Sequence, residues 1–276
     1  MKIFYCKNFK ERNKYLKYQY SDKNLTEERQ VRMNQIKDQE AKENFLMSEF
    51  ITIELLERMY GIKNPRILGK AGEKPRVEGN DKIHFSRSYA DRNMVIAIEV
   101  NHPVGIDGEE IMAMDEKLME SFFTKEEREY VEKSSDKNVA FTVIWTRKES
   151  YMKYTGEGLK TEFQLLNTAP ESYEDNQVDI ISNVLISQIK LKNTQKLILP
   201  PVMIPVTFEN QPELYIKTFI VNNTVVSVTG EGSSMKEIAY QEKRSYEEKS
   251  NRLFWKNSQS MFQENSHDGQ GHKTNL

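Results

Sequence analysis

Residues 137–156 read KNVAFTVIWTRKESYMKYTG, and this stretch decides the fold. Its helical pattern ends at Gly156, so it predicts one helix from Lys137 to Thr155. Within that helix, Trp145, Glu149 and Lys153 stand at positions i, i+4 and i+8. Successive steps of 100° therefore place these side chains within about 80° of one helical face, where they share a surface.

Strands are predicted on both sides of this helix. A short strand, 104–109, precedes it, and helical segments around 117–123 and 125–133 come between. Beyond Gly156 the pattern changes to strands at 184–191, 202–208, 214–221 and 224–228, the last two joined by Asn222 and Asn223. This mixture predicts an α/β (α+β) fold.

The N-terminal part repeats the order of helix, glycine and strand. Residues 26–60 predict a helix or a pair of helices that stops at Gly61, and a Gly/Pro/Lys-rich connection, 69–79, follows. Residues 83–88 and 94–100, joined by a polar turn at 90–93, predict an antiparallel hairpin. We therefore expect two similar halves, 1–103 and 104–230, which in one chain predict a monomer.

The remaining residues, 231–276, predict a polar tail that is partly disordered. It contains a candidate amphipathic helix from Ile238 to Trp255, followed by a polar end that includes His267 and His272. We expect neither of these two histidines to take part in chemistry.

Composition excludes several function classes. With 40 basic and 42 acidic side chains the net charge is −2, so nucleic acid is not an expected partner. The single cysteine, Cys6, excludes an internal disulfide, and no apolar run is long enough for a signal peptide or a membrane span. These features favour a cytoplasmic protein. Neither His84 nor His102 belongs to a nucleophile motif, and no phosphate-binding glycine loop is present, which disfavours triad hydrolases and the nucleotide folds built on such loops.

Two carboxylates, Asp107 and Glu109, stand two residues apart on the strand predicted at 104–109. Because strand side chains alternate between faces, both carboxylates point the same way. Magnesium would explain this pair of like charges, since it binds one or two protein carboxylates together with water and phosphate oxygens. Two solvated acids at the end of a strand are the alternative.

Glu127 has two interpretations. It is the last residue of TKEE at 124–127, which matches the capping box that stabilises the start of a helix. It is also a third acid near the first two in sequence. A glutamate that accepts a hydrogen bond from the Thr124 backbone has less freedom to bind a metal, so the two roles conflict.

The helix from Lys137 to Thr155 offers groups for phosphoryl transfer. Glu149 can act as a general base toward a hydroxyl, while Lys153 and Lys148 could neutralise a phosphate. The alternative is an ordinary Glu–Lys pair on a helix, with Trp145 in the core.

Taken together, these segments resemble the Sfp-type 4′-phosphopantetheinyl transferases. The two parts of that family's signature stand here as GIDGE at 105–109 and WTRKESYMK at 145–153, at matching separation. Between them FFTKEE at 122–127 is similar to a third family motif, and TGEGL at 155–159 continues the second. The resemblance covers roughly residues 1–230, with a longer connection between Gln164 and Val206 than the family leads us to expect.

The resemblance implies two similar α/β halves with coenzyme A in the cleft between them. It implies a magnesium ion held by Asp107, Glu109 and Glu127. A serine of an apo-acyl or peptidyl carrier protein would attack the β-phosphate of coenzyme A and receive its 4′-phosphopantetheine arm. Glu149 would accept the serine proton, and Lys153 would stabilise the pyrophosphate as adenosine 3′,5′-bisphosphate leaves.

The resemblance also implies positions that bind coenzyme A. Lys74 and Pro75 look like the family's G-K-P motif, although Glu73 replaces its glycine. Ser86 and Arg87 fall where the family has S-H, and arginine can still bind a 3′-phosphate because its guanidinium is a bidentate donor. Basic residues near the 3′-phosphate correspond to Arg29 and Arg32, whose alternative is exposed helix charge.

Two other function classes stay open at this point. The departures at Glu73 and Arg87 suggest a module that binds coenzyme A or a carrier protein without turnover, which the intact acidic and lysine positions disfavour. A magnesium-dependent phosphodiesterase would use a similar acidic cluster with water as its nucleophile, but the 145–153 motif does not predict it.

Overall fold

The structure, a computed structural model, describes residues 1–6, 25–90, 93–158, 164, 166–169, 202–204, 214–221, 223–231 and 239–242. The strand predicted at 184–191, the connection from 170 to 201 and most of the candidate helix from Ile238 to Trp255 lie outside the described residues. So do His267 and His272.

The N-terminal helices are α2 (Glu27–Gln35) and α3 (Gln39–Tyr60). Asp38 begins α3 by accepting a hydrogen bond from the Ala41 backbone N–H at 2.7 Å, and Gly61 ends it at φ 67°, a left-handed conformation that favours glycine. Helix α3 packs on a sheet of order β10-β1-β5-β4, formed by β1 (Lys2–Cys6), β4 (Ile83–Ala90), β5 (Asn93–Val100) and β10 (Ala239–Glu242). A short ribbon of β2 (Ile67–Leu68) and β3 (Arg76–Val77) lies beside it.

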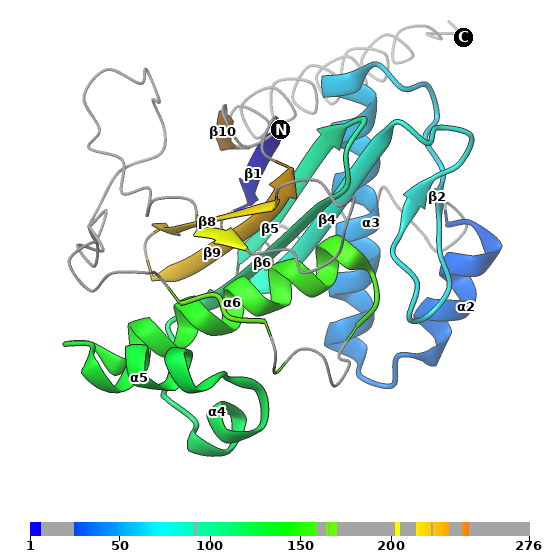
Figure 1. Ribbon diagram of the computed structural model, residues 1–276. Helices are drawn as coiled ribbons and strands as arrows, with labels where there is room; N and C mark the ends of the chain where they lie inside the picture. Colours follow the sequence, from blue (N-terminus) through cyan, green and yellow to red (C-terminus); the bar gives the residue numbers. More distant parts are fainter. Residues whose placement is uncertain are drawn as a thin grey trace, which may run out of the picture.

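The second sheet has the order β6-β9-β8-β7. Its strands are β6 (Val104–Glu110), β7 (Val202–Ile204), β8 (Leu214–Val221) and β9 (Thr224–Glu231), and all of its neighbours are antiparallel. Three helices, α4 (Glu116–Phe122), α5 (Lys125–Lys133) and α6 (Lys137–Thr155), stand between β6 and β7 in the chain. Helix α6 lies across β6, β8 and β9 (Figure 1).

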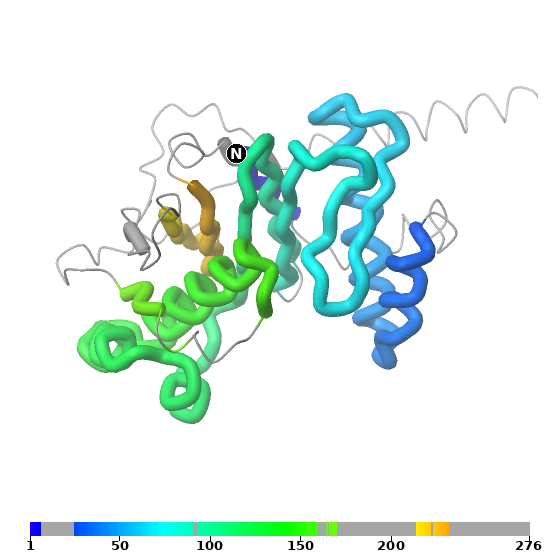
Figure 2. Tube along the Cα trace, turned by 45° about the vertical axis from the view of Figure 1, so that its right-hand side comes forward, coloured from blue at the N-terminus to red at the C-terminus, as the bar shows by residue number. Residues whose placement is uncertain are grey.

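The two sheets pack face to face between α3 and α6. One core joins α3 to residues of β1, β4 and β5, among them Phe50, Phe85 and Ile96. A second core fills the space between the sheets with side chains such as Val95, Ile106 and Val228. Because the residues of a strand alternate between its faces, β1 and β5 contribute to both cores. The tube in Figure 2 shows α6 and the α2–α3 pair on opposite sides of the sheets.

Strand β6 separates apolar from polar side chains by the same alternation. Val104 and Ile106 face the core between the sheets. Gly105 faces α6, so the alternation carries Asp107 and Glu109 to that side as well. The prediction that both carboxylates point the same way is confirmed, and they point toward the helix that bears Glu149 and Lys153.

Gly105 is required by the close approach of β6 to α6. A Cβ atom on this residue would lie 1.9 Å from the Ser150 backbone oxygen and 2.4 Å from the Tyr154 backbone nitrogen. We expect Gly105→Ala to lower the free energy of unfolding by about 1–3 kcal/mol, because backbone cannot move aside as a side chain can. Urea unfolding followed by circular dichroism measures this loss.

Gly108→Ala on the same strand is the matched control. Its Cβ would meet a side-chain atom, Val95 Cγ2, at 2.9 Å, and a side chain can shift at lower cost than the two backbone atoms that Gly105 faces, so we expect a smaller loss. An equal loss of stability in both variants would contradict the argument.

The mixed helix and sheet content predicted from the sequence is confirmed, as are the helices at 27–60, 116–133 and 137–155 and the hairpin of β4 and β5. Cys6 is buried in β1. The similarity of the two halves stays a prediction. Strand β10 lies inside the stretch expected to form an amphipathic helix, and it pairs in parallel with β1. None of the helices that the structure describes has the length and apolar character that a membrane span needs.

Candidate active site

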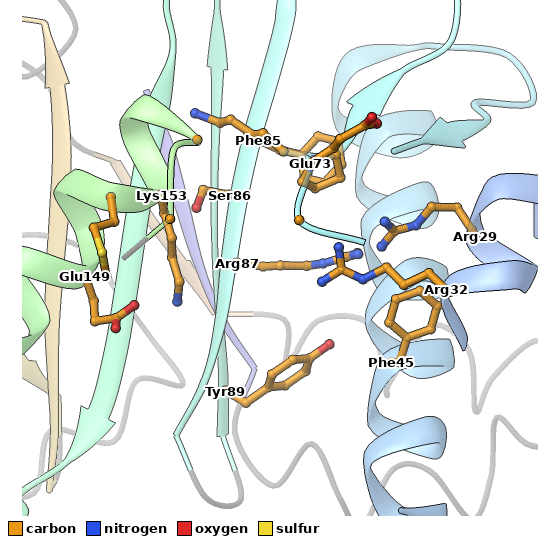
Figure 3. A pocket seen from close by; sticks show the side chains of 16 residues that line it. Arg29, Arg32, Phe45, Glu73, Phe85, Ser86, Arg87, Tyr89, Glu149 and Lys153 are labelled. Carbon is orange, nitrogen blue, oxygen red and sulfur yellow. The ribbon is translucent and has the colours of Figure 1, made fainter. Parts of the chain in front are cut away.

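A pocket of about 420 Å³ opens between α6 on one side and α2 and α3 on the other, with β4 as its floor (Figure 3). It brings together residues that are far apart in the sequence. Eight predicted site residues line it: Arg29, Arg32, Lys74, Pro75, Ser86, Arg87, Glu149 and Lys153. Helix α6 supplies Glu149 and Lys153 because these residues lie one turn apart on one helical face.

At the α6 end, Lys153 lines the pocket and contacts an aspartate directly. Lys153 Nζ lies 2.6 Å from Asp107 Oδ1 and 2.9 Å from Ser88 Oγ, and the Ser88 hydroxyl donates to the same Asp107 oxygen at 2.7 Å. Sequence reasoning did not assign Ser88 a role. The alternation of side chains along β4 could have indicated this residue, since Ser88 stands two residues from Ser86 and lies on the same face of the strand.

Three carboxylates gather around this contact. Burial, followed by the charge of Asp107, raises the pKa of Glu109 to about 7. Burial and then Asp107 also raise the pKa of Glu149, while Lys153 opposes both shifts. Asp107 Oδ2 is buried and has no hydrogen-bond partner among the residues that the structure describes. The charge of Lys153 therefore offsets the negative charge of this cluster only in part.

Glu127 does not join these carboxylates. Its Oε2 accepts from the Thr124 backbone N–H at 2.8 Å, which completes the capping box, and forms an ion pair with Lys148 at 2.9 Å. Its Oε1 accepts from both the backbone N–H and the hydroxyl of Thr168, each at 2.8 Å. Within the described ranges, no group of three His, Cys, Asp or Glu side chains is placed to hold a metal ion. The structure thus shows the capping box that Glu127 completes, while its role as a metal ligand stays a prediction.

Lys148 also lies outside the pocket. Its side chain is fully buried, and beyond the ion pair it donates to the Leu166 backbone oxygen at 2.6 Å. Burial lowers the pKa of Lys148, although Glu127 counteracts this. One residue along a helix is a turn of 100°, so Lys148 cannot share the face of Glu149 and Lys153. Trp145 is partly buried: it packs edge to face on Phe122, and both side chains lie against a core cluster.

The opposite end of the pocket is cationic. Arg29 and Arg32 come from α2 and Arg87 from β4, and the guanidinium carbons of the first two lie 4.7 and 5.9 Å from the ring centre of Phe45. Glu49, on α3, lies behind them and pairs with both Arg29 and Arg87. Burial opposes the ionisation of Glu49, but Arg87 and Arg29 outweigh it and lower its pKa.

The connection between β2 and β3 forms the upper rim. Lys74 Nζ donates to the backbone oxygens of Val104 at 2.9 Å and Tyr154 at 2.8 Å, so it ties this connection to the end of α6. Burial lowers its pKa to about 8. Glu73, at the position where glycine was expected, accepts a hydrogen bond from the Lys70 backbone N–H at 3.0 Å and closes the turn.

Comparison with known proteins places this site in context. Residues 103–198 match the model of the 4′-phosphopantetheinyl transferase superfamily. The 4′-phosphopantetheinyl transferase gsp of Aneurinibacillus migulanus is 36% identical over 151 residues, which are 51% of this chain and 60% of the relative. The 4′-phosphopantetheinyl transferase psf-1 of Bacillus pumilus is 28% identical over 49% of this chain and 58% of its own length.

A third relative is the 4′-phosphopantetheinyl transferase Sfp of Bacillus subtilis strain 168. It is 26% identical over 49% of this chain and 61% of its own length. The chain thus spans about three fifths of the length of these three curated relatives. The segment that matches the superfamily contains both signature motifs, so the resemblance of this chain to the Sfp-type 4′-phosphopantetheinyl transferases is confirmed.

Proposed function

We propose that the protein is a holo-carrier-protein synthase that transfers the 4′-phosphopantetheine arm of coenzyme A to a serine of an apo-carrier protein and releases adenosine 3′,5′-bisphosphate. One observation carries the proposal: a single pocket joins a cluster of arginines to Glu149 and Lys153, which stand beside the carboxylates of Asp107 and Glu109. Coenzyme A has a 3′-phosphate and a pyrophosphate, and these two charged groups match the two ends. The acceptor in this proposal is an acyl or peptidyl carrier protein.

A divalent cation fits the carboxylate end. Asp107 keeps one buried oxygen without a hydrogen-bond partner in the described part of the chain, and the carboxylates of Glu109 and Glu149 lie close enough to its charge for it to raise the pKa of both. Asp107 and Glu109 would hold magnesium, which takes one or two protein carboxylates beside phosphate oxygens. Bound there, the ion would neutralise charge on the pyrophosphate. Glu127, predicted as a third ligand, is committed to Lys148 and Thr168, and Glu149 is the third carboxylate of the cluster.

The side chains of α6 divide the work of the transfer. Glu149 accepts the proton of the carrier serine while the serine oxygen forms a bond to the β-phosphorus. The bond from that phosphorus to the bridging oxygen breaks, and adenosine 3′,5′-bisphosphate leaves with that oxygen. The raised pKa of Glu149 makes it a competent proton acceptor. Lys153 holds positive charge beside the phosphates. Lys148, predicted to share this role, supports the scaffold instead.

The remaining predicted residues bind the coenzyme in this proposal. Arg29, Arg32 and Arg87, with Ser86, face the 3′-phosphate, and Lys74 and Pro75 form the rim above the nucleotide. The pocket lies within one chain, which supports a monomer, and a single buried cysteine is in keeping with a reducing cytoplasm.

The test is an intact-mass assay on a panel of apo-acyl and apo-peptidyl carrier domains with coenzyme A and magnesium. We expect at least one carrier to gain the mass of the phosphopantetheine arm, and only when magnesium is present. Release of adenosine bisphosphate without any carrier would instead indicate a phosphodiesterase. Binding of coenzyme A with no gain on any carrier would leave a non-catalytic binding module.

A further inference from the structure

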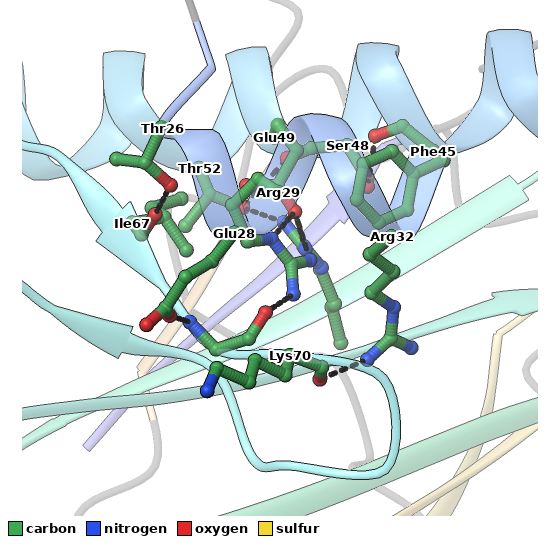
Figure 4. A network of polar contacts seen from close by, with 12 residues as sticks. Thr26, Glu28, Arg29, Arg32, Phe45, Ser48, Glu49, Thr52, Ile67 and Lys70 are labelled. Carbon is green, nitrogen blue, oxygen red and sulfur yellow. Dashed lines mark hydrogen bonds and ion pairs between the residues drawn. The ribbon is translucent and has the colours of Figure 1, made fainter. Parts of the chain in front are cut away.

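The buried carboxylate of Glu49 organises the cationic end of the pocket (Figure 4). Its Oε1 accepts hydrogen bonds from Arg29 Nε, at 3.1 Å, from a terminal nitrogen of Arg29, and from a terminal nitrogen of Arg87. Glu49 and Arg29 are each 1% exposed. One oxygen therefore holds two guanidiniums that come from different elements.

Other contacts fix the same two guanidiniums from behind. Arg29 donates through its other terminal nitrogen to the Gly69 backbone oxygen at 2.9 Å, and its plane lies over the ring of Phe45. Arg87 donates to the Thr52 hydroxyl at 3.0 Å, and that hydroxyl donates in turn to the Ser48 backbone oxygen at 2.7 Å. Phe45, Glu49 and Thr52 stand at i, i+4 and i+7 on α3, so one helical face presents the whole support.

The charges of this network do not cancel. Three guanidiniums, those of Arg29, Arg32 and Arg87, line the pocket, and Glu49 pairs with only two of them, Arg29 and Arg87. Burial lowers the pKa of Arg29, and the charge and hydrogen bonds of Glu49 oppose this shift. An anion in the pocket would complete the network, and a guanidinium fork matches phosphate oxygens.

We propose that Glu49 and Thr52 are positioning residues that hold Arg29 and Arg87 as a preformed cradle for a terminal phosphate. In consequence, this end of the pocket selects coenzyme A over dephospho-coenzyme A, which lacks the 3′-phosphate. The proposal rests on the proposed function for the identity of the ligand. Neither positioning residue needs to touch the ligand, since each acts through an arginine.

Two variants test the positioning without changing the charge of the pocket. Glu49→Asp keeps the carboxylate but withdraws it by one methylene, so it cannot reach both guanidiniums. Thr52→Val removes the hydroxyl that accepts from Arg87 and donates to the Ser48 backbone oxygen, and it keeps the branched shape of the side chain. The readout is the ratio of the dissociation constants for dephospho-coenzyme A and coenzyme A, measured by titration calorimetry on each variant. We expect this ratio to fall about tenfold in Glu49→Asp and about threefold in Thr52→Val, since a hydrogen bond to a charged group contributes about 1.5–3 kcal/mol.

The ratio separates positioning from general loss of structure. Both ligands are titrated into the same preparation, so a smaller folded fraction lowers both signals and leaves the ratio unchanged. Glu57→Asp, on the same helix outside the pocket, is the matched control and should keep the wild-type ratio.

Three outcomes would overturn the inference. If the wild type binds the two ligands equally, the cradle does not select a phosphate. If it discriminates and both variants keep its ratio, Glu49 and Thr52 do not position the arginines, while the proposed function stands. If it binds neither ligand, the proposed function fails together with this inference.

Discussion

Glu149→Gln is expected to lower the turnover number for transfer by about 10²- to 10⁴-fold at saturating magnesium and coenzyme A. The glutamine has the shape of the glutamate, but it cannot accept the serine proton. Glu149 is the carboxylate of α6 that lines the pocket and is influenced electrostatically by both Asp107 and Lys153. The intact-mass assay, run as a time course, measures the rate.

Two further measurements decide how Glu149 acts. If Glu149 acts only as a general base, Glu149→Gln leaves the half-saturating magnesium concentration unchanged. If its carboxylate is needed to bind the ion, the substitution raises that concentration strongly. Glu157→Gln, beyond the end of α6 and outside the pocket, is the matched control and should retain the wild-type rate. A Glu149→Gln variant within a few-fold of the wild type would remove this residue from the chemistry altogether.

Local patterns predicted much of the fold and one end of the site. Helix α6 and its end at Gly156 follow from periodicity and a glycine cap, and the shared face of Asp107 and Glu109 follows from strand alternation. These features depend on neighbours a few residues away. The parallel pairing of β10 with β1 joins residues near opposite ends of the chain, and no local pattern encodes that.

The features of the site that the sequence did not predict depend on contacts between elements that are distant in the chain. The capping box of Glu127 was visible in the sequence, but its ion pair with Lys148 exists only because α5 packs on α6. The sequence contains only a weak indication that Glu49 has a role: it is an acid that lies between Phe45 and Thr52 on the apolar face of a helix. Its two arginine partners come from α2 and β4, so the arrangement could not be derived without the fold.

Glu127→Gln is expected to lower the free energy of unfolding by about 3–5 kcal/mol, because it leaves the buried Lys148 ammonium without its counter-charge. Both side chains are fully buried, so water cannot replace the lost carboxylate. Thr168, which donates to Glu127, would also lose its ionised acceptor. Urea unfolding measures the loss, and the remaining folded protein should keep the wild-type requirement for magnesium.

Two companion variants isolate the buried pair. Glu129→Gln, on the same helix, breaks only exposed pairs with Lys125 and Lys133 and should cost less than about 1 kcal/mol. The double variant Glu127→Gln with Lys148→Met removes both charges, so it should be more stable than Glu127→Gln alone. If Glu127→Gln folds as stably as the wild type but needs far more magnesium, Glu127 binds the ion in the working enzyme, and the pairing with Lys148 is exchanged for a metal contact.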